Sequence, residues 1–321
     1  MAELRAPDAA DLGRRAESPA QIPWKGWKAV MQRTAKQMIT DRASLVAAGC
    51  AFYATLALFP AISMLVFIYG LVFDPVTVEP QLQVLREVLP PSAFQLITDR
   101  VHTLITKGSG TLGLGLIVST SVALWSAAAG TKSVIAALNM AYEEPERRSF
   151  LRFNATALGM TLCGVVGVSL AIATLVFLPA VVGWLGLSDY AQTLIRVLST
   201  LLMVGFVMLS LSLLYRFGPC RRMARWHWVT PGSLLATALW LIASSLFSLY
   251  VGRVASYDVT YGPLGAVVGV MMWFYVTAYV VLLGAELNSE LELQTARDST
   301  EGPSKPLGRR GAYVADHVAE G

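Results

Sequence analysis

The chain has 321 residues, of which 55% are hydrophobic and only 14% are charged. Soluble domains carry about 25% charged residues, so this composition excludes an ordinary soluble protein and indicates a polytopic membrane protein. The formal net charge is +4, and the placement of basic residues around membrane spans explains it without a nucleic-acid partner.

The N-terminal region divides into a tail and a helix. Residues 1–22 are polar and rich in Ala and Pro, which predicts a disordered tail with no cleavable signal peptide. In residues 24–42, Trp24, Trp27 and Val30 recur at helical spacing while Lys and Arg occupy other faces, so we expect an interfacial helix on an anionic membrane surface. This helix is either an anchor that sets the entry angle of the first span or a sensor of lipid headgroups.

Six long apolar segments follow, at about 44–73, 112–142, 153–187, 193–217, 229–251 and 264–285. The 22 positions of the last segment span about 33 Å as a helix, enough for a hydrocarbon core of about 30 Å. Backbone polar groups inside lipid must be satisfied within each helix, so the sequence predicts an all-α, six-transmembrane-helix bundle. The bundle and the interfacial helix form one membrane domain, residues 23–293, and residues 294–321 are expected to be a disordered cytoplasmic tail.

The connection between the first two spans, residues 74–111, is too long for a plain loop. Apolar residues recur every three to four positions on both sides of Pro90 and Pro91, which predicts two short amphipathic helices. Charged residues interrupt both runs, so neither can cross the bilayer, and we expect an extracytoplasmic helical hairpin. It is either a lid over a cavity or a packed surface cap.

The basic residues predict the orientation. Of the 25 Lys and Arg residues, 19 fall in residues 1–43, 143–152, 216–227 and the region after 290. Cytoplasmic loops carry the excess of basic residues, so both termini are expected in the cytoplasm.

Lys132 is a full charge well inside the second span, where an ammonium needs a partner or water. Its long stem can snorkel toward the cytoplasmic headgroups. Alternatively, it faces a polar cavity with Glu286, Asn139 or Asp41 as a partner. An anionic substrate would need such a cation.

Two further candidates lie in the first and last spans. Pro60 frees a backbone carbonyl in the middle of the first span, which can line a cavity or be repaired by neighbouring helices. Asn288 stands beside Glu286 in the short polar box that ends the last span.

Hydrolytic and metal chemistry have no support in the sequence. Metal sites need clustered ligands, but the three His and three Cys residues fall in separate regions: His102, His227, His317, Cys50, Cys163 and Cys220. No Walker A sequence and no G-x-S-x-G elbow is present. We therefore expect no enzyme, no catalytic residue, no metal and no cofactor.

Three blocks carry a family resemblance: LVAAGCAFYATLALFPAI shortly after Asp41, ALNMAYEEPERRSF at 137–150, and YGPLGAVVGVMMWFYVTAYVVLLGAELNSEL at 261–291. They resemble the BrkB/YihY-like family of bacterial inner-membrane proteins, whose older members were mislabelled as ribonuclease BN. The resemblance covers residues 27–293 and implies a multi-pass protein of the inner membrane. The family has no agreed activity, although roles in envelope integrity and in lipid or solute movement have been proposed. Matching positions are Asp41, Pro60, Asn139, Tyr142, Arg148, Phe150, Pro263, Gly284, Glu286 and Asn288, and Lys132 stands where a basic residue is expected.

Together, these features favour a transporter-like role in moving a lipid or anionic amphiphile, with membrane lipids as partners and no nucleic acid. The alternative is a non-transporting envelope-assembly or scaffold protein. A polar cavity that reaches Lys132 would favour transport, and a dry, tightly packed bundle would favour a scaffold. Assembly into an oligomer stays open.

Overall fold

The computed structural model describes residues 12–72, 109–184, 189–253 and 263–319. Within these ranges the chain is helical and has no β-strand, and one isolated antiparallel bridge joins Ala224 and Thr300. The helices in chain order are η1 (Pro19–Gln21), α1 (Trp24–Thr40), α2 (Ala43–Val72), α5 (Ser109–Ala141), α6 (Phe150–Trp184), α7 (Asp189–Phe217), α8 (Trp226–Arg253), α10 (Pro263–Gln294) and α11 (Tyr313–Asp316).

Four helices of the described chain are long and apolar enough to cross a membrane. The crossing segments are Phe150–Gly167, Thr193–Phe217, Trp226–Tyr250 and Val267–Gln294, and α2 adds a shorter apolar segment, Ala43–Leu58. The chain is therefore a multi-pass helical membrane protein. Each of the six expected spans falls on one long helix, but the count of six crossings stays a prediction. The hairpin expected at 74–111 lies almost wholly outside the described residues.

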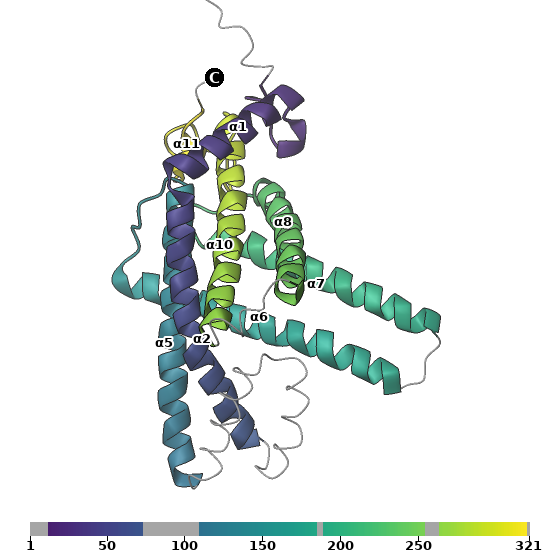
Figure 1. Cartoon of the computed structure of the whole chain (residues 1–321). Helices are drawn as coiled ribbons and strands as arrows, with labels where there is room; N and C mark the ends of the chain where they lie inside the picture. Colours follow the sequence, from purple (N-terminus) through teal and green to yellow (C-terminus); the bar gives the residue numbers. More distant parts are fainter. Residues whose placement is uncertain (1–11, 73–108, 185–188, 254–262, 320–321) are drawn as a thin grey trace, which may run out of the picture.

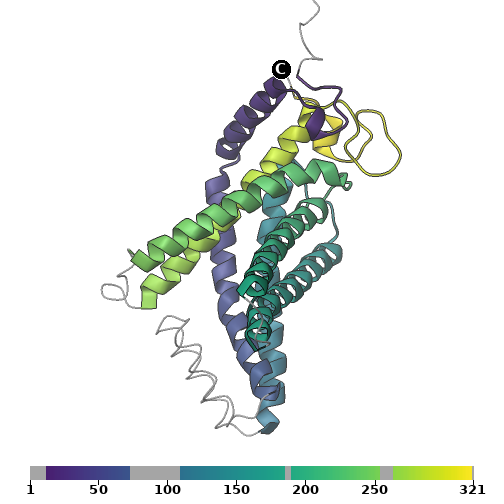
Figure 2. The same ribbon diagram turned by 90° about the vertical axis from the view of Figure 1, so that its right-hand side faces the viewer.

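The long helices pack as a bundle with a side arm. Helices α2 and α5 pack against each other, and α10 packs against both α2 and α8 (Figures 1 and 2). Helices α6 and α7 form an antiparallel pair that leans away from α2 and α5 in Figure 1. This pair joins the bundle through contacts of α6 with α5 and of α7 with α8.

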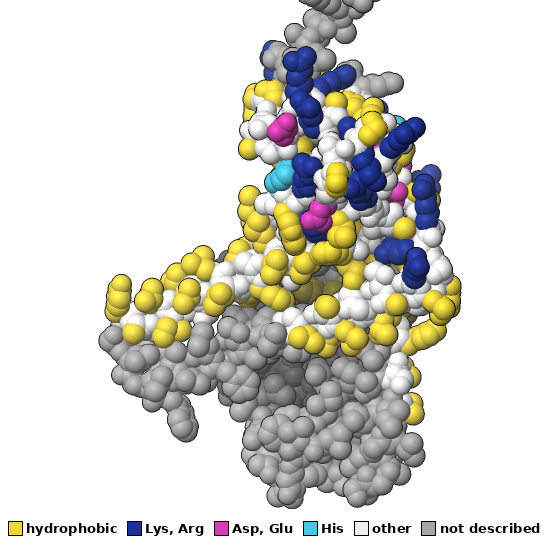
Figure 3. Space-filling model, turned by 180° about the vertical axis from the view of Figure 1, so that it is seen from behind, with side chains coloured by type: hydrophobic (Ala, Val, Ile, Leu, Met, Phe, Trp, Pro, Cys, Tyr) yellow, Lys and Arg dark blue, Asp and Glu magenta, His cyan; other side chains and the backbone are white. Residues whose placement is uncertain are grey.

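One end of the molecule is a polar cap. We define it as residues 12–40, 142–149, 218–225 and 295–319, which surround the C-terminal end of α10 (Figure 1). Lys and Arg side chains gather over this end, whereas apolar side chains cover the helices below it (Figure 3). The cap and the adjoining helix ends also contain the largest fully buried side chains of the described chain, among them Tyr142, Trp228 and Leu291. Large side chains are therefore fully buried where the helices meet the cap, whereas the spans below keep exposed apolar side chains for lipid.

Helix α1, within the region where an interfacial helix is expected, packs on protein along one face. Its buried residues Gly26, Val30, Thr34 and Met38 recur every fourth position, which places them on a single face. Trp24, Met31 and Ile39 remain exposed. The helix ends before Arg42, whose φ of 51° is left-handed and turns the chain into α2.

The N-terminal and C-terminal tails are expected to be disordered, but their described residues are joined to each other by hydrogen bonds. Gln294 donates a hydrogen bond of 2.6 Å to the carbonyl of Leu12, and Thr295 donates one of 2.6 Å to the carbonyl of Ala16. The buried Arg310 guanidinium donates to the carbonyls of Ala296, Arg297 and Ala315 at 2.6 to 3.0 Å. Composition predicts disorder because the tails have little apolar surface to bury. Charge-assisted hydrogen bonds to backbone carbonyls provide the order here.

Candidate functional site

The candidate site is the polar box at the C-terminal end of α10. Glu286, Asn288, Glu290 and Glu292 are all buried, with 0 to 6% of their surface exposed. Each step of two residues rotates a side chain by about 200° around the helix, so these residues face different elements. The end of α10 therefore connects several parts of the cap.

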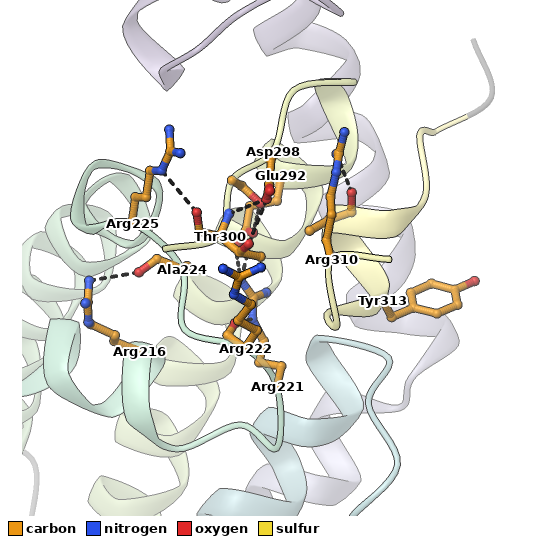
Figure 4. Close-up of polar contacts among 12 residues, drawn as sticks. Arg216, Arg221, Arg222, Ala224, Arg225, Glu292, Asp298, Thr300, Arg310 and Tyr313 are labelled. Carbon is orange, nitrogen blue, oxygen red and sulfur yellow. Dashed lines mark hydrogen bonds and ion pairs between the residues drawn. The ribbon is translucent and has the colours of Figure 1, made fainter. Parts of the chain in front are cut away.

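Glu292 forms a buried ion pair with Arg221. The Arg221 Nη2 atom lies 2.8 and 2.7 Å from the two carboxylate oxygens, and the two side chains are 2% and 0% exposed. Ser299 donates a further hydrogen bond of 2.5 Å to Glu292, and the guanidinium lies 4.7 Å from the centre of the Tyr142 ring. Buried charges need such additional bonds to offset their desolvation. The pair joins the 218–225 loop to α10 (Figure 4).

Glu290 holds helix α1. Its carboxylate accepts a hydrogen bond of 2.6 Å from the Arg33 Nε atom. The same guanidinium donates to the Gln294 side chain at 2.7 Å. One arginine of α1 is thereby bound at two positions one turn apart on α10.

The Asn288 side chain connects α10 to α8 through two hydrogen bonds. Its Oδ1 atom accepts from the Gly232 N–H at 2.8 Å, and its Nδ2 atom donates to the Val229 carbonyl at 3.1 Å. Pro231 lies between these two residues in α8 and has no N–H, so it leaves the His227 carbonyl without its helical donor in the same turn. A Cβ atom at Gly232 would collide with the Gly284 carbonyl and the Asn288 amide. Only glycine permits this backbone approach.

Glu286 lies within hydrogen-bonding reach of Asp41, so the fold brings two predicted site residues together. Gln37 donates from one amide nitrogen to Asp41 at 3.1 Å and to Glu143 at 3.0 Å. Glu143 is largely exposed, but partial burial raises the pKa of its carboxyl, and the negative charges of Asp41 and Glu290 raise it further. Carboxyl groups therefore converge where α1 and α5 end against α10.

Asn139 belongs to a different group of contacts. Its amide donates to Glu146 at 2.9 Å and accepts from the Cys220 N–H at 2.7 Å. Glu146 also accepts from Arg148 at 2.7 and 2.8 Å. Hydrogen bonds from Arg148, followed by those from Asn139, hold the pKa of Glu146 at about 2. Asn139 thus fixes the loops that follow α5 and α7.

Lys132 does not meet its predicted partners. Its Nζ atom lies 5.3 Å from the centre of the Trp125 ring, and among the described residues no carboxylate is within 4.0 Å of it. Pro60 lies within α2, but its side chain is outside the described set. The parts of the chain that are described contain no group of three or more His, Cys, Asp or Glu able to hold a metal ion.

The sequence did not predict that the tails and the cytoplasmic loops pack together as one cap. Sequence reasoning recognised Glu286 and Asn288 of the polar box but not Glu292 or its buried partner Arg221, and it gave Gly232 no role. The available signals were an arginine-rich loop at 220–225 and four polar residues at alternating positions on one helix end. Such a loop is equally typical of a solvated cytoplasmic surface.

The fold and the site define a multi-pass helical membrane protein whose spans join a polar cap through buried polar contacts. The chain matches the family model described as virulence factor BrkB over residues 34–308, and it belongs to this family. The family resemblance of the sequence blocks is thus confirmed.

Relatives carry two kinds of name. The ribonuclease-like protein YfkH of Bacillus subtilis is 31% identical over 250 residues, which are 76% of this chain and 88% of the relative. A UPF0761 membrane protein of Aeromonas salmonicida is 26% identical over 77% of this chain and 83% of its own length. A UPF0761 membrane protein of Albidiferax ferrireducens is 25% identical over 88% of this chain and 66% of its own length. No solved structure matches the chain.

Proposed function

We propose that the protein is a transporter of the bacterial inner membrane that moves an anionic lipid or amphiphile, with Lys132 contacting the anionic group. The observation that carries the proposal is the setting of Lys132. The side chain lies in an apolar helix beside an aromatic ring, and no described carboxylate neutralises it. An ammonium in such a place is costly unless something binds it.

The direction of the Lys132 side chain supports this role. In the orientation that the basic residues predict, the polar cap and both termini are cytoplasmic. Lys132 is nine residues, about 14 Å of helix, from the end of α5 at the cap. A snorkelling lysine would extend toward those nearer headgroups. Instead, the ammonium lies over Trp125, seven residues farther from the cap. Side chains lean toward the N-terminus of their helix, which for α5 points away from the cap, so the ammonium stays inside the apolar span where an anionic group can meet it.

The neighbour of Lys132 favours an amphiphile over a small soluble anion. Trp125 is 73% exposed, so the described part of α5 presents this ring to the surroundings of the helix. In a bilayer, an anionic headgroup could approach the ammonium along this face while its acyl chains stay in lipid. This lateral route needs no enclosed polar cavity.

Lipid movement can be measured directly on the full-length protein in vesicles. We expect the protein to move fluorescently labelled phosphatidylglycerol between leaflets faster than labelled phosphatidylcholine. Reduction of the label by dithionite in the outer leaflet measures this movement. Lys132→Met should remove the acceleration, and Lys132→Arg should retain part of it because the charge survives. Lys36→Met is the matched control, since this lysine is exposed on α1.

Two results would overturn the proposal. The first is wild-type protein that moves neither lipid faster than empty vesicles do. The second is Lys132→Met with the activity of the wild type. Either result would leave the scaffold role as the better account of the fold.

A further inference from the structure

The buried Glu286 and the half-buried Asp41 form an acid pair that the lipid-moving proposal does not use. Glu286 is 0% exposed, and among the described residues neither of its carboxyl oxygens receives a hydrogen bond. The Oδ2 atom of Asp41 is also buried without a donor in the described chain. These two groups lie within hydrogen-bonding reach of each other.

The charged neighbours of this pair come from three elements. Helix α1 contributes Arg33, but its guanidinium is bound by Glu290 and by Gln294. The end of α5 contributes the exposed Glu143 and the buried Tyr142 ring, which is near enough to interact with the charge of Glu286. Glu290 is the next acid on α10.

Helix α2 adds only apolar residues at the start of its buried face, Ala43 and Ala47. Arg42, the residue after Asp41, is exposed. No described cation therefore pairs with Glu286 or with the buried oxygen of Asp41.

Ionised carboxylates accept hydrogen bonds and donate none. Two of them facing each other in a buried site repel, and each loses its hydration without compensation. One proton placed between them turns one group into a donor and satisfies the other as acceptor. A metal ion fits less well, because hard cations take six or more oxygen ligands and, among the described residues, no three acids lie close enough together to hold one ion.

We propose that Asp41 and Glu286 form a proton-binding site in which the two carboxyl groups share one proton. Gln37 links Asp41 to the exposed Glu143, so the site has a polar connection to the surface of the cap. The proton site is independent of what the protein moves. In a transporter it would be the natural place for proton coupling, since intramembrane acids mark proton relays.

The test is infrared difference spectroscopy on full-length protein in phosphatidylcholine vesicles. Above about pH 6 ordinary exposed carboxyl groups are ionised, so a protonated-carboxyl C=O band that shifts in heavy water would report the shared proton. We expect this band in the wild type and its loss as the pH is raised further. Glu286→Gln should remove it, because the less buried Asp41 then ionises. Asp41→Asn should shift its frequency, because Glu286 remains buried without a cation but loses the carboxylate that accepts its proton.

Glu301→Gln is the matched control, because this acid is also in the cap but is half exposed and paired with Arg216. It should leave the band unchanged. If one acid-pair variant fails to fold, the other variant and the wild-type titration still decide the question. A wild type without the band, or a band that Glu286→Gln or Asp41→Asn leaves unchanged in intensity and frequency, would overturn the proposal. So would a band that sodium chloride removes and choline chloride does not, since the ligand would then be a metal cation.

Discussion

At the scale of single residues, the most constrained contact is the crossing of α8 and α10. Gly232 and Gly284 bring the two backbones together, and the Asn288 amide satisfies α8 beside Pro231. Small residues allow such approaches between membrane helices, where packing and hydrogen bonds replace the hydrophobic effect as the driving force. The position has no space for even one methyl group.

Gly232→Ala should therefore destabilise the protein. Overpacking typically costs about 1–3 kcal/mol, and here the added Cβ would meet backbone as well as a side chain. Thermal unfolding followed by size-exclusion chromatography in detergent should show a clear loss of stability. Gly269→Ala on α10 is the control, because a Cβ there meets nothing within 4 Å. Equal stability of the two variants would mean that the crossing is not tight.

At the scale of elements, α1 is attached to the bundle by a polar tether as well as by packing. Its buried face contacts α10, and Arg33 binds Glu290 and Gln294. Its exposed apolar residues, Trp24 and Ile39 among them, remain available to a membrane surface. The element can thus serve as an anchor that fixes how the chain enters α2.

Arg33→Met should loosen α1 without unfolding the spans. The substitution removes hydrogen bonds to a charged group, each worth about 1.5–3 kcal/mol, and leaves Glu290 without its cation. Amide hydrogen exchange in residues 24–40 should become faster, while exchange in α8 stays unchanged. Lys36→Met provides the matched control on the exposed side of the same helix. Unchanged exchange in α1 would show that apolar packing alone holds it.

At the scale of the whole molecule, the polar cap collects basic segments that are far apart in sequence (Figure 3). This concentration agrees with the charge asymmetry of the sequence, in which 19 of the 25 basic residues fall in four regions. If that asymmetry sets the orientation, the whole cap lies on the cytoplasmic side.

Single cysteines in a background without Cys50, Cys163 and Cys220 can test this orientation. We expect cysteines at positions 9, 223 and 304 to react with a membrane-impermeant maleimide only when the cytoplasmic side is accessible. Cysteines at 92 and 256 should react only from outside. Labelling of position 92 from the cytoplasm would contradict the assignment.

The sequence by itself determined the features that depend on composition and local periodicity. Long apolar runs indicated a helical membrane protein, and the spacing in residues 24–42 predicted a helix that the structure contains as α1. The family followed from three local blocks. Lipid imposes helical structure on any long apolar segment, so such features need no knowledge of distant contacts.

The tertiary structure decided which polar residues meet. It placed Glu286 beside Asp41 and moved Asn139 into the loop contacts with Glu146, whereas Lys132 was left beside Trp125. Composition alone predicts that the C-terminal tail is disordered. In the structure this tail is ordered, because Arg310 donates hydrogen bonds to its backbone carbonyls. These pairings join residues from separate helices and loops. Their energies depend on burial and distance, which one-dimensional spacing does not contain.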